Sequence, residues 1–136
     1  MRVIEVNLPI HVIRVYDNYP KVLVKTLYHF SIGRPGYLTK IGMHHEVLWT
    51  DKDHFSKSFN AAMPYSVFFY GGQAFHAGNV HTESHGCIHL SLNDAKWLFN
   101  WVGSNTKVDK RIRVRIIGPY SHQMGLRPTL PTQGIA

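Results

Sequence analysis

Residues 75–89 read FHAGNVHTESHGCIH, so four histidines and the only cysteine of the chain, Cys87, lie within fifteen residues. A thiol becomes a nucleophile when a nearby imidazole takes its proton, which can lower the thiol pKa by several units from about 8.5. Gly86 permits a sharp turn before the cysteine, so the backbone N–H groups of Gly86 and Cys87 are predicted to point at a developing oxyanion. Thiol, base and oxyanion donors are the minimum set for acyl transfer.

Two other interpretations of the same stretch stay open. Histidine and cysteine are zinc ligands, and a structural zinc site needs four of them. The stretch offers five candidates: His76, His81, His85, Cys87 and His89. Their spacing matches no known zinc motif. Cys87 is also a candidate buried core thiol, because free cysteine is among the most buried residue types. Its glycine and polar neighbours disfavour that interpretation.

The sequence around this stretch predicts a mainly β domain. β-branched and aromatic runs recur about every ten residues in the first half of the chain, with turn formers between them. Arginines alternate with Ile112, Val114 and Ile116 near the other end, which predicts a strand with one buried and one solvated face. The strands are therefore expected near residues 3–6, 12–15, 22–30, 66–70 and 112–116.

One helix is predicted, directly after the cysteine. Ser91 and Asp94 form a Ser-x-x-Asp capping pattern. Apolar residues then follow at i, i+3, i+4 and i+7 from Ala95, and Gly103 is well placed to end the helix. The expected helix covers residues about 93 to 102.

Length and charge limit the organisation and the partners. The 136 residues fit one domain, predicted as 1–118, followed by a Pro, Gly, Ser and Thr-rich tail at 119–136 that is loosely ordered or packed on the surface. The formal charge of +7 attracts anionic polymers, but no run of basic residues favours nucleic acid. Residues 1–20 contain no apolar segment of signal-peptide or membrane-spanning length, so neither is expected.

The ordered set of motifs resembles the L,D-transpeptidase (YkuD-type) catalytic domain. SHGCI at 84–88, FHAG at 75–78 and NDA at 93–95 resemble the active-site signature and the helix after it. The segment FSIGRPGYLT at 30–39 and residues 60–70 resemble the segments leading to that site, so the resemblance covers residues 3 to 117. It implies a β-sandwich-like domain with one main α-helix after the active-site cysteine.

The resemblance also implies a role for each site residue. Cys87 is the implied nucleophile, which attacks the diaminopimelate–D-Ala bond of a peptidoglycan tetrapeptide stem and forms a thioester, and His76 is the implied base. The Ala77 carbonyl is expected to orient His76. The implied substrate and oxyanion contacts come from residues that surround the nucleophile: Ser84, His85, Gly86, Ala77 and His89. No metal or organic cofactor is implied. His89 stands where the family usually has Arg or Asn, which leaves the contact made there open.

Several functions fit this reading. An amine from a neighbouring stem would resolve the thioester as a transpeptidase, and water would resolve it as an L,D-carboxypeptidase. Either activity implies peptidoglycan stem peptides as partners and a periplasmic or cell-wall location. Two alternative functions would use the same site. One is a wall-editing toxin effector, with an immunity protein as its partner, and the other is a cytoplasmic thiol hydrolase. A zinc-binding or cell-wall-binding module is the alternative of a different class.

Overall fold

A computed structural model describes residues 1–103 and 111–120. The secondary structure is almost entirely β, with one helix between the last two strands. The elements are β1 (Arg2–Asn7), β2 (Val12–Asn18), β3 (Val22–Leu27), β4 (Phe30–Ser31), β5 (Gly42–Glu46), β6 (Trp49–Ser56), β7 (Ala61–Tyr70), β8 (Gln73–Ala77), β9 (Ile88–Leu90), α1 (Leu92–Gly103) and β10 (Ile112–Ile117).

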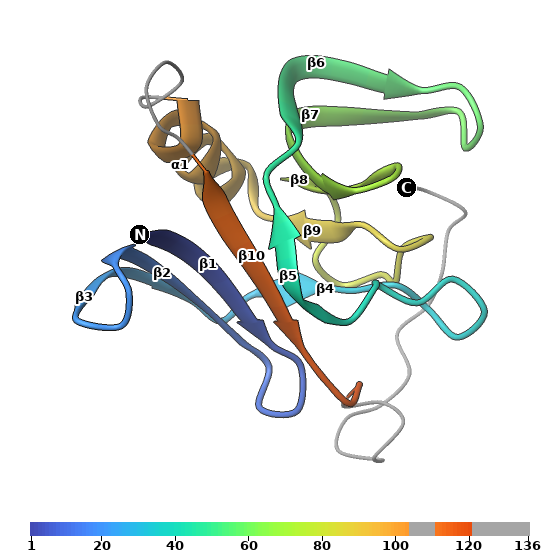
Figure 1. Ribbon diagram of the computed structural model, residues 1–136. Helices are drawn as coiled ribbons and strands as arrows, with labels where there is room; N and C mark the ends of the chain where they lie inside the picture. The colour runs from blue at the N-terminus through green and yellow to red at the C-terminus, as the bar shows by residue number, and fades with distance from the viewer. Residues whose placement is uncertain (104–110, 121–136) are drawn as a thin grey trace.

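The strands form two five-stranded mixed sheets. The first has the order β3-β2-β1-β10-β5 and the second the order β4-β9-β8-β7-β6. One pair in each sheet is parallel, β1 with β10 and β8 with β9, and the other pairs are antiparallel. The two sheets lie on either side of a shared core, with α1 beside β7 and β8 (Figure 1). The predicted β-sandwich-like class is confirmed.

The core lies between the sheets because each sheet buries one face of alternating strands. On β10, Ile112, Val114 and Ile116 are buried, while the arginines between them point outward. This strand is the one predicted from the Ile/Val and Arg alternation. Arg115 lies 3.9 Å from Glu5 and donates to the Tyr19 hydroxyl at 2.5 Å, so its outward face carries a polar network.

Helix α1 begins and packs as its sequence predicts. The Ser91 hydroxyl accepts a hydrogen bond from the Asp94 N–H at 3.2 Å, which caps the first turn. Ala95, Leu98 and Val102 are buried on the core side. Within the described residues, no helix is long and apolar enough to cross a membrane.

The hairpin of β6 and β7 is bent, and this bend creates the roof of the site. The β6–β7 register runs from Trp49–Phe68 to Ser56–Ala61 but lacks a pair at Tyr65. Tyr65 has a φ of 57°, a conformation that bulky residues rarely adopt in a strand. One half of the hairpin therefore stays in the sheet, and the other half curves away from it, as the green strands in Figure 1 show.

Three details differ from the sequence-based expectations or lie beyond them. The run predicted as one strand at 22–30 is divided, because β3 ends at Leu27 and pairs with β2, whereas β4 begins at Phe30 and pairs with β9 in the other sheet. Tyr120 is buried in the main core cluster. The rest of the predicted tail, 121–136, lies outside the described residues.

Candidate functional site

The parallel pair β8–β9 places His76 and Cys87 on the same face of the sheet. Phe75 pairs with Ile88 and His76 pairs with His89, so Cys87 lies beside Ala74, one step before β9 begins. Side chains alternate between faces along a strand, so Phe75 and Ile88 point into the core while Cys87, His76 and His89 point to the opposite face. Cys87 and His76 are therefore diagonal neighbours on this face.

His76 is held in one orientation by the backbone. Its Nδ1 lies 2.8 Å from the Ala77 carbonyl oxygen, and the side chain is buried. A carbonyl can only accept a hydrogen bond, so Nδ1 carries the proton and the neutral ring keeps its lone pair on Nε2. In the neutral form of the ring, this is the tautomer that a general base requires. The Ala77 carbonyl therefore makes the contact that was expected of it.

Cys87 lies in a small apolar cluster under the bent hairpin. The cluster consists of the buried residues Ala61, Met63, Phe68, Ala74 and Cys87, with Phe59 packed against it. Burial raises the pKa of the Cys87 thiol from 9.0 to about 12, and a backbone hydrogen bond with Ala74 acts in the opposite direction. The thiol is 3.7 Å from the Gly72 carbonyl oxygen, to which it donates.

The raised thiol pKa corrects a prediction from the sequence. A cysteine with a neighbouring histidine was expected to have a lowered pKa, but burial raises the Cys87 pKa instead. The apolar cluster around Cys87 disfavours the thiolate, and this desolvation outweighs the other influences. In the resting protein Cys87 is therefore a protonated thiol at neutral pH.

The turn before Cys87 is fixed by buried hydroxyl groups. The Ser84 hydroxyl donates to the Cys87 carbonyl oxygen at 2.5 Å and accepts the Gly86 N–H at 3.0 Å. The Thr39 hydroxyl donates to the Gly86 carbonyl oxygen at 2.8 Å and accepts the Gly33 N–H at 3.0 Å. Gly86 has a φ of 122°, which glycine adopts readily. The Gly86 N–H that was expected to face an oxyanion is thus donated to Ser84 instead.

His89 lies behind His76 and is fully buried. The two rings meet edge to face, with centroids 4.9 Å apart. His89 Nδ1 lies 2.9 Å from the Asn79 carbonyl oxygen, which also accepts the Ser31 hydroxyl at 3.2 Å. A Cβ at Gly78 would lie 2.9 Å from the His89 ring, so this ring requires glycine at position 78. His89 therefore supports both the base and the loop that follows it.

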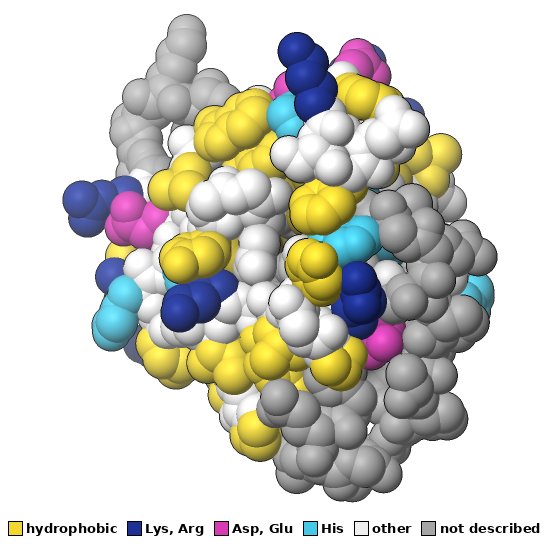
Figure 2. All heavy atoms as spheres, turned by 90° about the vertical axis from the view of Figure 1, so that its right-hand side faces the viewer, with side chains coloured by type: hydrophobic (Ala, Val, Ile, Leu, Met, Phe, Trp, Pro, Cys, Tyr) yellow, Lys and Arg dark blue, Asp and Glu magenta, His cyan; other side chains and the backbone are white. Residues whose placement is uncertain are grey.

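A cleft of about 610 Å³ opens over Cys87. His85 lines it and is packed between aromatic rings, stacked on Phe59 at 4.2 Å and edge to face with Tyr37 at 4.8 Å. The outer half of the hairpin forms the opposite wall. Figure 2 looks onto this side of the molecule and shows hydrophobic side chains, with a few Lys, Arg and His side chains among them. Cys87 thus lies at the wall of an open, mainly apolar cleft.

The predicted site residues separate into two groups in space. Cys87 and His85 line the cleft. Ser84, Gly86 and His89 are buried and hold the turn or the base from within the protein. The donor atoms of the zinc alternative do not come together: in residues 1–103 and 111–120, no group of three or more His, Cys, Asp or Glu side chains is placed to hold a metal ion.

Sequence reasoning missed the residues that the hairpin contributes to the site. His54 and Phe59 line the cleft with Cys87, although they are about thirty positions away in the chain. The sequence DKDHF at 51–55 puts His54 among acidic residues, a pattern that is typical of an exposed strand. The bend at Tyr65 turns this segment toward Cys87, and no sequence signal marked that bend in advance.

Comparison with known proteins identifies the family and the fold. Residues 1–109 match the family model for YkuD, the L,D-transpeptidase catalytic domain. A search of curated proteins finds no match. Among solved structures, an L,D-transpeptidase from Stackebrandtia nassauensis aligns with a TM-score of 0.73 and 22% identity over 88% of this chain and 56% of that chain.

Two further structures have the same fold. An L,D-transpeptidase from Mycobacterium smegmatis aligns with a TM-score of 0.67 and 19% identity over 84% of this chain and 58% of its own. An L,D-transpeptidase in complex with imipenem aligns with a TM-score of 0.67 and 21% identity over 83% of this chain and 58% of its own. This chain thus spans less than two thirds of the length of these proteins. On the match over residues 1–109, the chain belongs to the YkuD family of L,D-transpeptidase catalytic domains.

Proposed function

We propose that this protein is a peptidoglycan L,D-transpeptidase that uses Cys87 as its nucleophile and His76 as its base. The observation that carries the proposal is the His76 tautomer. Its Nδ1 proton is donated to the Ala77 carbonyl, so Nε2 is left as the proton acceptor on the face that His76 shares with Cys87. A nucleophile paired with an oriented base is the arrangement that thiol acyl transfer requires.

Acylation follows from this geometry. The Cys87 sulfur attacks the carbonyl carbon of the diaminopimelate–D-Ala bond, and its proton moves to Nε2 of His76. His76 then gives that proton to the nitrogen of D-Ala as the C–N bond breaks, which leaves the stem as a thioester on Cys87. An amine from a second stem forms the cross-link, and water gives the carboxypeptidase product instead.

The oxyanion has one backbone donor next to the nucleophile in this proposal. The Gly86 N–H is already donated to Ser84, so the Cys87 N–H is the donor that we assign to the developing negative charge. Removing one such donor from an enzyme typically slows the chemistry by about 10²–10³-fold. Ser84 and Thr39 fix the direction of this donor through their hydrogen bonds to the 86–87 backbone.

The substrate of this reaction sets the place of action. Peptidoglycan lies outside the cytoplasmic membrane, so we propose a periplasmic or cell-wall location with stem peptides as the partners. The effector interpretation, with an immunity protein, rests on no contact in the structure and is not part of the proposal.

Intact-mass spectrometry tests the proposed function. The parent protein and Cys87→Ala would be incubated with a disaccharide-tetrapeptide and, separately, with imipenem. We expect a covalent adduct and loss of the terminal D-Ala only when Cys87 is present, and His76→Ala should form the adduct at least about a hundredfold more slowly. A parent protein that gives neither an adduct nor a product under these conditions would refute the proposal. Dimeric or hydrolysed product distinguishes transpeptidase from carboxypeptidase activity.

A further inference from the structure

We propose that Gln73 is a positioning residue for the nucleophile turn, whose carboxamide holds the Gly86–Cys87 peptide so that the Cys87 N–H faces the developing oxyanion. The inference rests on the proposed function, because it concerns how a donor of that reaction is aimed. Gln73 lines the same cleft as Cys87.

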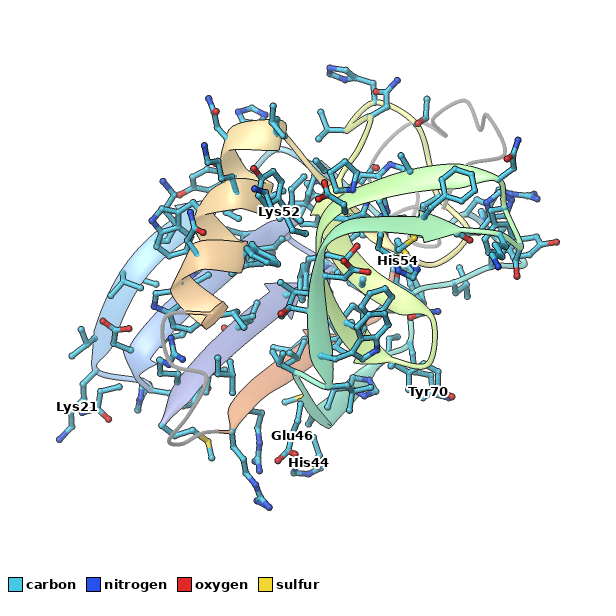
Figure 3. The ribbon with its side chains drawn as sticks, turned by 90° about the horizontal axis from the view of Figure 1, so that it is seen from above. Lys21, His44, Glu46, Lys52, His54 and Tyr70 are labelled. Carbon is cyan, nitrogen blue, oxygen red and sulfur yellow. The ribbon has the colours of Figure 1, made fainter. Side chains whose placement is uncertain are left out.

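The backbone of Gln73 is anchored next to the nucleophile. Gln73 begins β8 and pairs with Tyr70, the last residue of β7, across a two-residue turn. Tyr70 points outward from this end of the hairpin, as Figure 3 shows. The Cys87 sulfur contacts the backbone on both sides of Gln73, because the thiol donates to the Gly72 carbonyl oxygen at 3.7 Å and has a backbone hydrogen bond with Ala74.

The carboxamide of Gln73 brackets Thr39. Its Nε2 donates to the Leu38 carbonyl oxygen at 3.1 Å, and its Oε1 accepts the Lys40 N–H at 2.9 Å. A carbonyl only accepts and an N–H only donates, so the two bonds together allow one orientation of the carboxamide. Leu38 and Lys40 are the chain neighbours of Thr39. Gln73 therefore fixes the backbone on both sides of this threonine.

Thr39 transmits this constraint to the nucleophile. Its hydroxyl donates to the Gly86 carbonyl oxygen at 2.8 Å. That carbonyl belongs to the same peptide unit as the Cys87 N–H, and the two groups of a planar trans peptide point in opposite directions. A hydrogen bond that holds the carbonyl therefore also aims the N–H. The aim depends on the placement of Thr39, which Gln73 secures.

Gln73 also contacts Gly86 directly. A Cβ at Gly86 would lie 2.6 Å from Nε2 and 3.1 Å from Cδ of Gln73, so the carboxamide occupies the space that a side chain would need. A Cβ at Gly33 would lie 2.9 Å from the Gly86 Cα. Gly86 is thus in close contact with the Gln73 side chain and with Gly33. These contacts limit rotation of the turn that ends at Cys87.

The aim of this one N–H matters because the other candidate donor is engaged. The Gly86 N–H is donated to the Ser84 hydroxyl, so the proposed reaction depends on the Cys87 N–H. An oxyanion donor is effective when it is oriented before the charge develops. A misdirected Cys87 N–H should therefore slow acylation and leave the reactivity of the sulfur itself unchanged.

Two reactions of Cys87 separate these effects. Acylation by imipenem or by the disaccharide-tetrapeptide develops a negatively charged oxygen, whereas alkylation by iodoacetamide displaces iodide from carbon and needs no oxyanion donor. Gln73→Met keeps the length of the side chain and removes both hydrogen bonds. Lys21→Met is the matched control, because it introduces the same side chain at an exposed residue on the opposite side of the molecule from Tyr70 (Figure 3).

We expect the acylation rate of Gln73→Met to fall by roughly 10- to 100-fold, with the alkylation rate within about threefold of the parent. For the disaccharide-tetrapeptide the loss should appear in kcat, with KM within about twofold of the parent, because the donor acts in the transition state. Lys21→Met should match the parent in both reactions. Intact-mass spectrometry follows each adduct, and urea denaturation shows that each variant is folded.

A double-mutant cycle tests whether Gln73 acts through Thr39. In a Thr39→Val background, Gln73→Met should slow acylation by less than about threefold, because the hydroxyl that transmits the constraint is already absent. Equal slowing by Gln73→Met in the parent and in Thr39→Val would overturn this route. The comparison of acylation with alkylation stands without the cycle if Thr39→Val does not fold.

The inference is overturned if Gln73→Met slows acylation and alkylation by the same factor, which is the result of a general disturbance of the site, or if it slows neither. A parent that forms no Cys87 adduct with either acylating compound overturns the proposed function, and this inference with it. A parent that is acylated no faster than a folded Gln73→Met overturns this inference alone.

Discussion

Thr39→Val is the substitution that tests most directly how the turn at Cys87 is held. The Thr39 hydroxyl is fully buried and joins two backbone segments, accepting from the Gly33 N–H at 3.0 Å and donating to the Gly86 carbonyl oxygen at 2.8 Å. Valine has nearly the same shape but removes both bonds. Each buried group that loses its partner costs about 1–3 kcal/mol, so the free energy of unfolding should fall by about 2–5 kcal/mol.

Thr39→Ser is the matched control for this substitution. Serine keeps the hydroxyl and loses one buried methyl group, which costs about 1 kcal/mol. Urea denaturation measures the difference. With a slope of about 1–3 kcal/mol per M, the midpoint of Thr39→Val should lie roughly 1 M or more below that of the parent. Acylation by imipenem should also slow for the valine variant, since the Gly86–Cys87 backbone is no longer held. Equal midpoints for the valine and serine variants would refute this reasoning.

The other two predictions concern the thiol and the helix cap. The Cys87 pKa is raised from 9.0 to about 12 by folding, so the stability that this protonated thiol contributes is complete below pH 9 and is lost as the pH rises from 9 to 12. The urea midpoint should therefore fall less steeply between pH 9 and 12 for Cys87→Ala than for the parent. The same pH dependence of the midpoint in both proteins would contradict the raised pKa of the buried thiol. Ser91→Ala removes the cap on the Asp94 N–H and should lower the free energy of unfolding by about 1 kcal/mol. Ser91→Asp should restore the cap and most of that free energy. An unchanged free energy of unfolding in Ser91→Ala would show that the cap is not needed.

The elements that local sequence determines were predictable. The helix at Leu92–Gly103 follows from its serine cap and the apolar spacing after it, and both signals lie within twelve residues. Strand β10 follows from its strict alternation, which the sheet converts into one buried and one polar face. The motif predicts Cys87 and His76 as partners, and the parallel register of β8 and β9 places them on one face of the sheet.

The roof of the site was not predictable, because it depends on contacts between distant segments. The bend at Tyr65 lies in a strand whose residues read as ordinary β sequence. This bend brings Phe59 and Met63 against Cys87, and the resulting desolvation determines the protonation of the thiol. A histidine in the same motif as a cysteine suggests a candidate proton acceptor. It does not indicate where that proton rests, because this depends on what surrounds the sulfur.

The resting thiol has a consequence for the order of events in the site. A thiol with a pKa of about 12 holds its proton at neutral pH, donated to the Gly72 carbonyl, while Nδ1 of His76 is hydrogen-bonded to the Ala77 carbonyl. Sulfur becomes more acidic as it shares an electron pair with a carbonyl carbon, so in the proposed mechanism proton transfer to His76 accompanies attack and does not precede it. Oxidation of cysteine follows thiolate character and exposure, and Cys87 has little of either before a substrate arrives. In the proposed reaction, burial thus delays the reactivity of Cys87 until a carbonyl reaches the cleft.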